Sequence, residues 1–288
     1  MINIHKHSLY KEMEVDSILS NVFNLYFKKF FVLFAASFIA IFIMQFLFYQ
    51  LGFLQIYKAS LCDMDELLRV YSKLVGKIAV ASGVSVVLYG MLNAFLYTYL
   101  IKTDIDPEAH IGEIIIESFR KYAIHMVFYL ILTMLMLIAG MFVGIIALII
   151  GSIVALIYLG TVLIPGGAVI VAEEKNAIEA IGRTFSLTHK DFWSVLGAVV
   201  LFILIMVLVS IVIAAITAIP FAIMFFDSWG ETESFKEMFN AKLYNIGIWT
   251  VLINSITSAA TYPLYVIISL VLYFKLIYGE NKNIPQEQ

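Results

Sequence analysis

The sequence predicts an all-α, polytopic membrane protein, a helical bundle with six transmembrane helices. The composition is the first observation, since 62% of the 288 residues are hydrophobic and 14% are charged. A soluble domain is usually about half apolar and a quarter charged. Long apolar runs are the second observation, and short amphipathic segments ahead of pairs of runs are the third. The net charge of -3 excludes a nucleic-acid partner, which would require a basic patch or stripe.

The N-terminal segment has no apolar core and no small-residue cleavage site, so we expect no signal peptide. The first hydrophobic segment is then expected to direct insertion. Cys62 is the single cysteine, which excludes an intramolecular disulfide and a metal cage built from cysteines. We expect 1–14 and 280–288 to be flexible cytoplasmic tails around one integral membrane domain, 1–288.

The spans are predicted from the length of the apolar runs, because a spanning helix needs about 20 mostly apolar residues. The runs that qualify are 30–57, 78–101, 122–172, 192–226 and 244–274. The run 122–172 is about two spans long. It therefore predicts a hairpin, with its turn near 140–144. Pro263 is expected to kink the last span, since proline removes a backbone donor.

The orientation is predicted from Lys and Arg near the span ends. These residues favour the N-terminal segment, the loops after spans two and four, and the C-terminal tail by about two to one. The positive-inside rule then predicts both termini in the cytoplasm, and we expect a multi-pass protein of a bacterial cytoplasmic membrane.

An internal repeat is predicted from three amphipathic segments that begin at Asp16, Gly112 and Ile178. An alignment without gaps superposes Phe23, Phe119 and Phe185. We predict three surface helices on the cytoplasmic side, each followed by a two-span hairpin. The approximate repeat units are 15–101, 111–172 and 176–278. The alternative is that any two amphipathic segments align at helical spacing.

The charged stretch 173–193 is the densest in the chain, and it is tested first as a site. A site for a hard cation needs several converging oxygens, whereas Glu179 lies on the polar face of its predicted helix. A solvated polar face is therefore favoured over a metal site. Arg183 and Lys190 are also candidates for contact with anionic lipid headgroups, at about 1 kcal/mol per basic residue.

Polar residues inside the predicted spans are the other candidates. Asn254, Ser255, Ser258 and Thr261 precede Pro263 in span six and form a candidate intramembrane polar cluster. Such residues line a transport cavity or, more often, hold packed helices together. His125 begins span three, where an interfacial imidazole is favoured over a functional intramembrane group.

The run PGGAVIVAEEKNAIEAIGRTFSLTHKDFW, Pro165 to Trp193, resembles the signature of the membrane domain of glycerophosphoryl diester phosphodiesterases and of related six-span bacterial membrane proteins. The matching residues are Pro165, Glu174, Glu179, Ala180, Arg183, Leu187 and Trp193. Phe185 is the interfacial residue of the same helix, and Thr184 stands where serine is usual. No room remains for a catalytic barrel of about 250 residues, so the resemblance implies no phosphodiesterase activity.

The expected function is that of a non-enzymatic membrane protein with a lipid-interacting or scaffolding role. No nucleophile elbow, phosphate loop or catalytic carboxylate pair is present in the sequence. Membrane lipids are the expected partners, with an unidentified membrane or cytoplasmic protein as a further one, and no cofactor is expected. The alternative is a transporter, or a permease-like subunit, that uses a polar cavity near span six.

Overall fold

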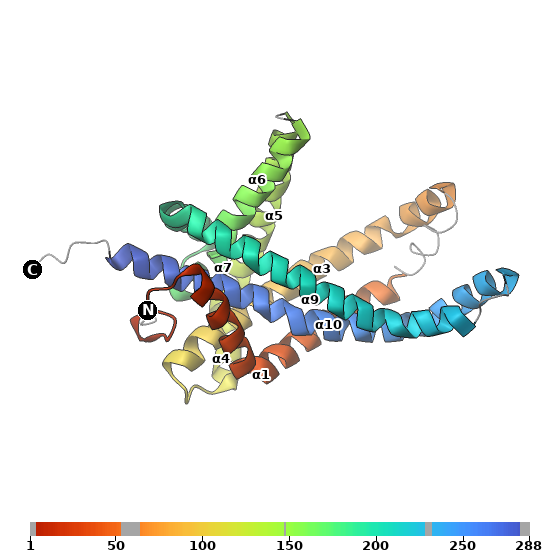
Figure 1. Cartoon of the computed structure of the whole chain (residues 1–288), viewed down its shortest axis with the longest axis horizontal. Helices are drawn as coiled ribbons and strands as arrows, with labels where there is room; N and C mark the ends of the chain where they lie inside the picture. Colours follow the sequence, from red (N-terminus) through yellow and green to blue (C-terminus); the bar gives the residue numbers. More distant parts are fainter. Residues whose placement is uncertain (1–3, 53–63, 147, 228–231, 283–288) are drawn as a thin grey trace, which may run out of the picture. The chain divides into compact units, whose positions relative to one another are not determined.

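The computed structural model describes residues 4–52, 64–146, 148–227 and 232–282 (Figure 1). All regular elements in these ranges are helical. They are η1 (Ile4–Lys6), α1 (Val15–Gln50), α3 (Met64–Ile105), α4 (Ile111–Glu117), the π-helical turn η2 (Ser118–Tyr122), α5 (Ala123–Ile146), α6 (Leu148–Leu163), α7 (Gly166–Ala172), α8 (Ala177–Thr188), the 3-10 turn η3 (His189–Asp191), α9 (Phe192–Asp227) and α10 (Thr232–Lys282).

Six helical segments of the described ranges are long and apolar enough to cross a membrane. They are Val15–Gln50, Leu67–Ile105, Ile111–Ile145, Ile150–Ala172, Ala177–Ile213 and Val251–Lys282. The predicted all-α, six-span fold class is confirmed by these segments. The end of the first predicted span, 53–57, and Cys62 lie outside the described residues.

The chain divides into two units, which are described separately. Unit 1 comprises Met1–Leu33, Val86–Phe202 and Tyr262–Gln288, and unit 2 comprises Phe34–Ser85 and Ile203–Thr261. In unit 2, α1 carries an aromatic ladder at i, i+4 spacing, in which Phe34, Phe38, Phe42 and Phe46 stack with ring centroids 5.7–6.0 Å apart. This spacing places the rings on one helix face.

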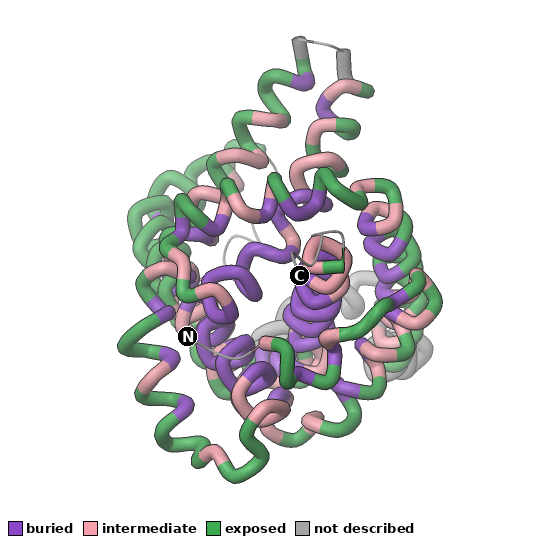
Figure 2. Tube along the Cα trace, turned by 90° about the vertical axis from the view of Figure 1, so that its left-hand side faces the viewer, coloured by how far each residue is buried: buried purple, intermediate pink, exposed green. Residues whose placement is uncertain are grey.

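The core of unit 1 consists of three inner segments, defined as 92–101 of α3, 165–172 around α7 and 266–274 of α10. Each is buried at every position, and the buried stretches are purple in Figure 2. By contrast, α5 exposes Ile124, Phe128 and Met134, which are 55–60% accessible. Apolar side chains at this exposure are expected to face lipid when the helix crosses a membrane.

A chain of hydroxyl groups joins the three inner segments. The Tyr97 hydroxyl donates to Ser269 Oγ at 2.6 Å, and Ser269 Oγ donates to the carbonyl oxygen of Ile164, also at 2.6 Å. These residues come from α3, α10 and the junction of α6 and α7. Since water is not available in the interior, each polar group requires such a partner, and the chain fixes how the segments pair.

The fourth span is broken between α6 and α7 at Ile164 and Pro165. The Tyr129 hydroxyl donates to the Leu163 carbonyl, so the hydrogen bonds lost at the break are partly replaced. A Cβ atom at Gly166 would overlap the Tyr129 hydroxyl, and one at Gly167 would overlap the Tyr97 ring. The two glycines therefore let the tyrosine rings lie directly against the backbone.

The predicted hairpin turn at 140–144 is wrong, because α5 continues to Ile146 and α6 begins at Leu148. The glycines of this stretch serve close packing instead. A Cβ atom at Gly144 would meet the Ser152 backbone, and one at Gly140 would meet the Leu159 side chain. Two helices approach closely where small residues face each other, which explains the Gly-x-x-x-Gly spacing.

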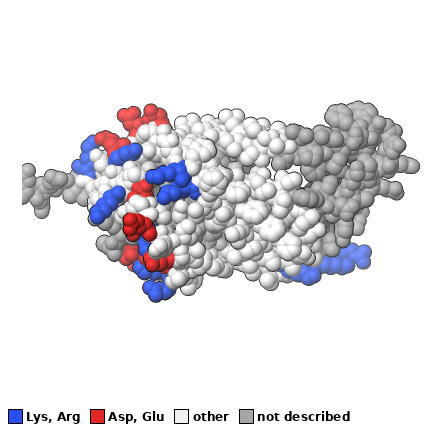
Figure 3. Space-filling view, turned by 90° about the horizontal axis from the view of Figure 1, so that it is seen from below, with Lys and Arg blue, Asp and Glu red and all other residues white. Residues whose placement is uncertain are grey.

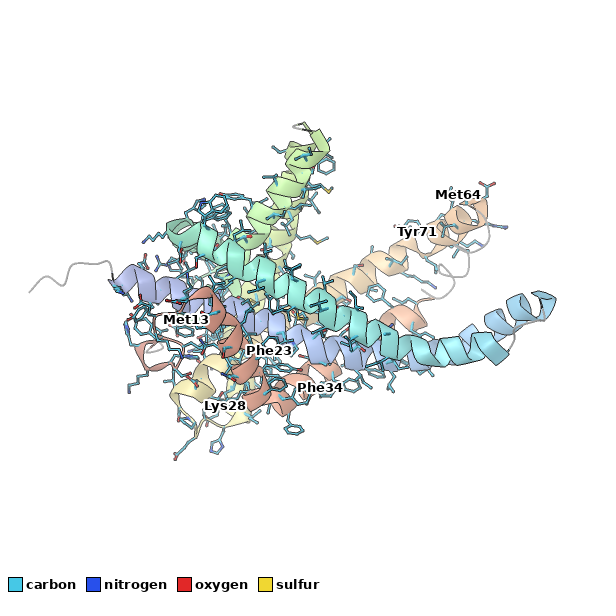
Figure 4. All side chains as sticks on the ribbon, viewed as in Figure 1. Met13, Phe23, Lys28, Phe34, Met64 and Tyr71 are labelled. Atoms are coloured by element: carbon cyan, nitrogen blue, oxygen red, sulfur yellow. The ribbon has the colours of Figure 1, made fainter. Side chains whose placement is uncertain are left out.

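The three amphipathic segments continue into the spans that follow them. The first is part of α1, the second joins α5 through the π turn η2, and the third, α8, joins α9 through η3. Phe23 and Lys28 of the first copy are labelled in Figure 4, where both lie on α1. The same aligned positions are buried in each copy: Ile18, Ile114 and Ala180; then Val22, Ser118 and Thr184; then Tyr26, Tyr122 and Thr188.

The expectation of a flexible tail over 1–14 is wrong for residues 4–14, the N-terminal strap. Its Ser8 backbone N–H donates to Asp104 at 2.6 Å, and its Tyr10 hydroxyl accepts from Asn281 at 2.9 Å. Leu9 and Met13 are buried. Burial of these apolar side chains thus favours docking of the strap on unit 1. The strap is mostly polar in sequence, so this docking was not predicted. The strap meets the C-terminal end of α10.

Candidate functional site

Charged side chains of unit 1 gather at one end of the unit, where acidic and basic groups are interspersed beside an uncharged surface (Figure 3). The residue that directly follows each inner segment belongs to this group, since these residues are Lys102, Glu173 and Lys275. Each forms an ion pair: Lys102 with Glu117, Glu173 with Arg183, and Lys275 with Asp191. The three ion pairs therefore mark the ends of the three inner segments.

The densest part is the charged cluster, defined as Glu173, Lys175, Arg183, Lys190 and Glu280. Arg183 Nε donates to both Glu173 oxygens at 3.1 Å, and its Nη1 donates to Glu280 Oε1 at 3.0 Å. Lys175 pairs with Glu173 at 3.0 Å and Lys190 with Glu280 at 2.6 Å. A guanidinium group holds two carboxylates well because its donors form a rigid fork.

This geometry corrects the view of Arg183 as part of a solvated polar face. The Arg183 side chain is only 21% exposed, and both carboxylates it contacts are 15% exposed. Arg183 thereby ties α8 to the end of α7 and to the end of α10. Glu280 was expected in a flexible tail, yet it lies in α10; 283–288 are outside the described residues.

The helix α8 is positioned by its start and by its buried face. Asn176 caps it by accepting from the backbone N–H groups of Ile178 and Glu179, and the Glu179 side chain accepts from Asn176 N at 3.4 Å. This reciprocal capping box gives the exposed Glu179 a structural role. Ala180 and Leu187 are completely buried, so the small and apolar positions of the motif face the protein.

Aligned positions in the second and third amphipathic segments make equivalent contacts. The alignment on Phe119 and Phe185 places Glu117 opposite Arg183. Glu117 pairs with the lysine that follows the first inner segment, and Arg183 pairs with the glutamate that follows the second. The contact is retained while the signs of its charges are exchanged, which a search for identical residues would miss.

A pocket of about 150 Å³ lies beside the charged cluster and is lined by Lys121, Tyr122, His125, Glu174 and Lys175. The Tyr122 hydroxyl donates to Glu174 Oε1 at 3.4 Å. Glu174 has a φ of 53°, in the left-handed region that side chains other than glycine seldom adopt. His125 is thus placed at a polar surface pocket at the beginning of α5.

The remaining predicted residues are dispersed. Pro165 lies at the α6–α7 break, Trp193 is 80% exposed, and Phe185 stacks on His189 with ring centroids 5.8 Å apart. In unit 2, Asn254 is exposed and Ser258 is half-buried.

Two hydroxyls of the candidate intramembrane polar cluster, those of Ser255 and Thr261, bond within their own helix. Ser255 donates to the Val251 carbonyl at 2.7 Å, and Thr261 donates to the Thr257 carbonyl at 3.1 Å. Bonds to the preceding turn satisfy these hydroxyls without a partner helix.

Sequence reasoning missed two residues that organise this end of unit 1. Glu280 lies seven residues after Tyr273, whose hydroxyl donates to Glu173 at 3.3 Å, so helical spacing would have placed them on one face. His7 gives no comparable signal. Its ring is buried and stacks on Phe274 at 4.2 Å, and burial lowers the pKa of His7 to about 4 although Asp104 opposes the shift.

Comparisons with protein-family models, curated proteins and solved structures return no match for this chain. Among the described residues, no group of three or more His, Cys, Asp or Glu is arranged to hold a metal ion. The helices themselves define the class, by their length and composition: this is a multi-pass, α-helical membrane protein.

Proposed function

We propose that this chain is a non-enzymatic protein of the cytoplasmic membrane with a lipid-interacting or scaffolding role. The observation that carries the proposal is that charged side chains at the end of unit 1 form ion pairs with one another. Glu173, Arg183 and Glu280 are engaged with one another and join helix ends. Ion pairs placed in this way hold helix ends together, and that structural role is the one we propose for them. Ion pairs that fix the helix ends give this end of unit 1 a rigid surface. A rigid surface next to lipid-facing helices suits a scaffold.

The proposed orientation places both termini and the charged cluster in the cytoplasm. The excess of Lys and Arg near the corresponding span ends supports it. Two contacts between the ends of the chain support only the part of this proposal that puts both termini on one side, because Lys282 pairs with Glu12 at 2.9 Å and Asn281 donates to Tyr10. Segments that touch in this way belong on the same side of the membrane.

Lipid dependence is tested with the full chain in nanodiscs made of phosphatidylcholine, with or without phosphatidylglycerol. We expect the anionic lipid to raise the unfolding midpoint by about 2–4 °C, which corresponds to about 1 kcal/mol for a chain of this size. The difference should shrink at high salt, because exposed charges are screened. Equal midpoints in both lipids at low salt would contradict the lipid part of the proposal.

Transport is the second candidate, and the break between α6 and α7 favours it. Discontinuous helices form the substrate sites of many transporters. Access is tested with Thr261→Cys in a Cys62→Ser background, by labelling with a small cationic thiol reagent in proteoliposomes. Modification at residue 261 would support a water-filled path at span six, and complete protection would overturn a path through that polar cluster.

The resemblance to the membrane domain of glycerophosphoryl diester phosphodiesterases is also a proposal. Its support comes from the positions of the motif residues. Pro165 lies at a helix break, Arg183 holds two carboxylates, and Leu187 is buried. A motif composed of such structural residues would define a membrane domain without defining a reaction.

A further inference from the structure

The pocket adjoins the ion pairs at the ends of the inner segments, because its two lysines, Lys121 and Lys175, pair with Glu117 and Glu173 of those ion pairs. Three elements line it: the π turn η2 supplies Lys121 and Tyr122, the first turn of α5 supplies His125, and the connection between α7 and α8 supplies Glu174 and Lys175. Two observations mark it as more than a surface irregularity. Isolated π turns and strained backbone both occur preferentially at functional sites, and both are found in its lining.

Two of the five lining residues are lysines. The Lys121 side chain is 44% exposed and the Lys175 side chain is 32% exposed, so both side chains are partly accessible to solvent. Lys121 also contacts Glu117 at 2.9 Å, and Lys175 contacts Glu173 at 3.0 Å, which holds the two amino groups in place. A lining that holds two lysines and an imidazole suits a phosphate oxygen, because lysine amino groups form charge-assisted hydrogen bonds with it.

The lining also contains a hydrogen-bond acceptor. It is the carboxylate of Glu174, which is held in a strained backbone conformation and accepts from the Tyr122 hydroxyl. A bare phosphate would meet repulsion here, whereas an amine or hydroxyl group next to the phosphate would donate to the carboxylate. A volume of about 150 Å³ accommodates such a headgroup but not a whole lipid. Three lining residues, Lys121, Tyr122 and His125, lie in the candidate span Ile111–Ile145, so acyl chains could remain beside α5.

We propose that this pocket binds the phosphate of a phosphoester that carries a neighbouring amine or hydroxyl, as in the headgroup of an ethanolamine or glycerol phospholipid. The lipid form of this proposal rests on the proposed lipid-interacting function. The same chemistry is present in water-soluble phosphoesters, so the test separates the two sources.

The test uses the purified full chain in detergent and native mass spectrometry to measure the occupancy of added lipid. Phosphatidylethanolamine and phosphatidylglycerol are compared with phosphatidylcholine, whose headgroup ends in a quaternary ammonium without a donor. We expect one tightly bound lipid, with phosphatidylcholine about fivefold weaker for want of one hydrogen bond. Phosphoethanolamine and glycerol 3-phosphate are then added as competitors.

Two variants and one matched control assign the binding to the pocket. Lys121→Gln and Lys175→Gln should each weaken binding about fivefold, since each removes one basic contact. Arg120→Gln removes a charge from the same π turn, outside the residues that line the pocket, and should change binding less than twofold. Circular dichroism spectra and unfolding midpoints confirm that each variant is folded.

Each outcome decides the proposal. Loss of binding in the two lysine variants but not in Arg120→Gln supports it, and displacement by the soluble phosphoesters identifies an aqueous ligand rather than a lipid. Equal binding by all four proteins, or no preference over phosphatidylcholine, overturns it. Binding at the pocket would itself add to the midpoint shift in the nanodiscs, because a ligand bound to the folded state stabilises it. A shift that persists in Lys121→Gln and Lys175→Gln would therefore support the proposed function even where the pocket proposal fails.

Discussion

Arg183 shows how a residue that looks solvated in sequence becomes a structural element in the folded chain. Its guanidinium group contacts two carboxylates, one directly after the second inner segment at Glu173 and one near the C-terminal end of α10 at Glu280. Pairing of this kind is needed because an unpaired charge is costly once it is partly removed from water. The arginine is therefore expected to matter for stability more than for headgroup contact.

Replacement of Arg183 tests this role. Arg183→Gln leaves Glu173 and Glu280 close together without their shared cation, and we expect a loss of about 2–3 kcal/mol in the free energy of unfolding. Thermal unfolding in detergent measures it, with Arg120→Gln as a control expected within about 0.5 kcal/mol of the wild type. An Arg183→Gln protein as stable as the control would contradict the structural role.

His7 predicts a dependence of stability on pH. In the unfolded chain, His7 takes up a proton near its ordinary pKa of 6.5. In the folded chain, burial lowers the pKa of His7 to about 4, so its ring stays neutral down to that pH. The unfolded state thus binds more protons between these values, so stability is complete above pH 6.5 and falls as the pH is lowered towards 4. The full loss is about 3 kcal/mol.

The variant His7→Phe isolates this contribution. Phenylalanine keeps the ring that stacks on Phe274 but cannot take up a proton. Unfolding midpoints measured from pH 7 to pH 4 should fall more steeply for the wild type than for the variant. Parallel curves would show that the strap does not hold a neutral histidine.

At the scale of the elements, the break between α6 and α7 lies at the start of an inner segment. Tyrosine side chains pack against the backbone there. Gly166 and Gly167 are required there for lack of space, since any Cβ atom would overlap a tyrosine ring or its hydroxyl. Gly160 of α6 offers a contrast, because a Cβ atom there would meet nothing within 4 Å. The two kinds of glycine cannot be distinguished in the sequence.

Alanine substitutions separate them. Gly167→Ala should destabilise the protein by about 1–3 kcal/mol, because Tyr97 and the backbone must move apart. Gly160→Ala should be neutral or stabilising by up to about 1 kcal/mol, because alanine favours the helix. Unfolding midpoints in detergent compare the two. Equal effects would mean that the break is loosely packed.

The sequence was sufficient for the helical class and the six spans, because length and apolarity determine them. It was insufficient where a position depends on a distant partner. The turn predicted at 140–144 failed because glycine serves both turns and close packing, and only Ser152 across the hairpin distinguishes these uses. Of the site, Arg183 was singled out, whereas Glu280 was not, because their contact spans 97 residues.

For the whole molecule, the orientation in the membrane is predicted only from the distribution of Lys and Arg near the span ends. We propose that the charged cluster lies in the cytoplasm, so Ser186, an exposed residue of α8, should be on that side. In a Cys62→Ser background, Ser186→Cys should react with a membrane-impermeant maleimide only after spheroplasts are permeabilised.

The native Cys62 provides the matched control for the other side. It lies between the first two candidate spans in the sequence. It should react in intact spheroplasts if the proposed orientation is right. The reverse pattern at the two positions would place the termini outside the cytoplasm.

The hydroxyl chain from Tyr97 through Ser269 to Ile164 has a consequence for biogenesis. Its first contact joins residues 172 positions apart. A ribosome will have inserted α3, α6 and α7 well before the serine emerges. Until then, Tyr97 has no Ser269 to bond, and a nascent chain truncated before the last span would present an unfinished polar surface inside the bilayer. The hydrogen bonding inside unit 1 would therefore be complete only after the last span has been inserted.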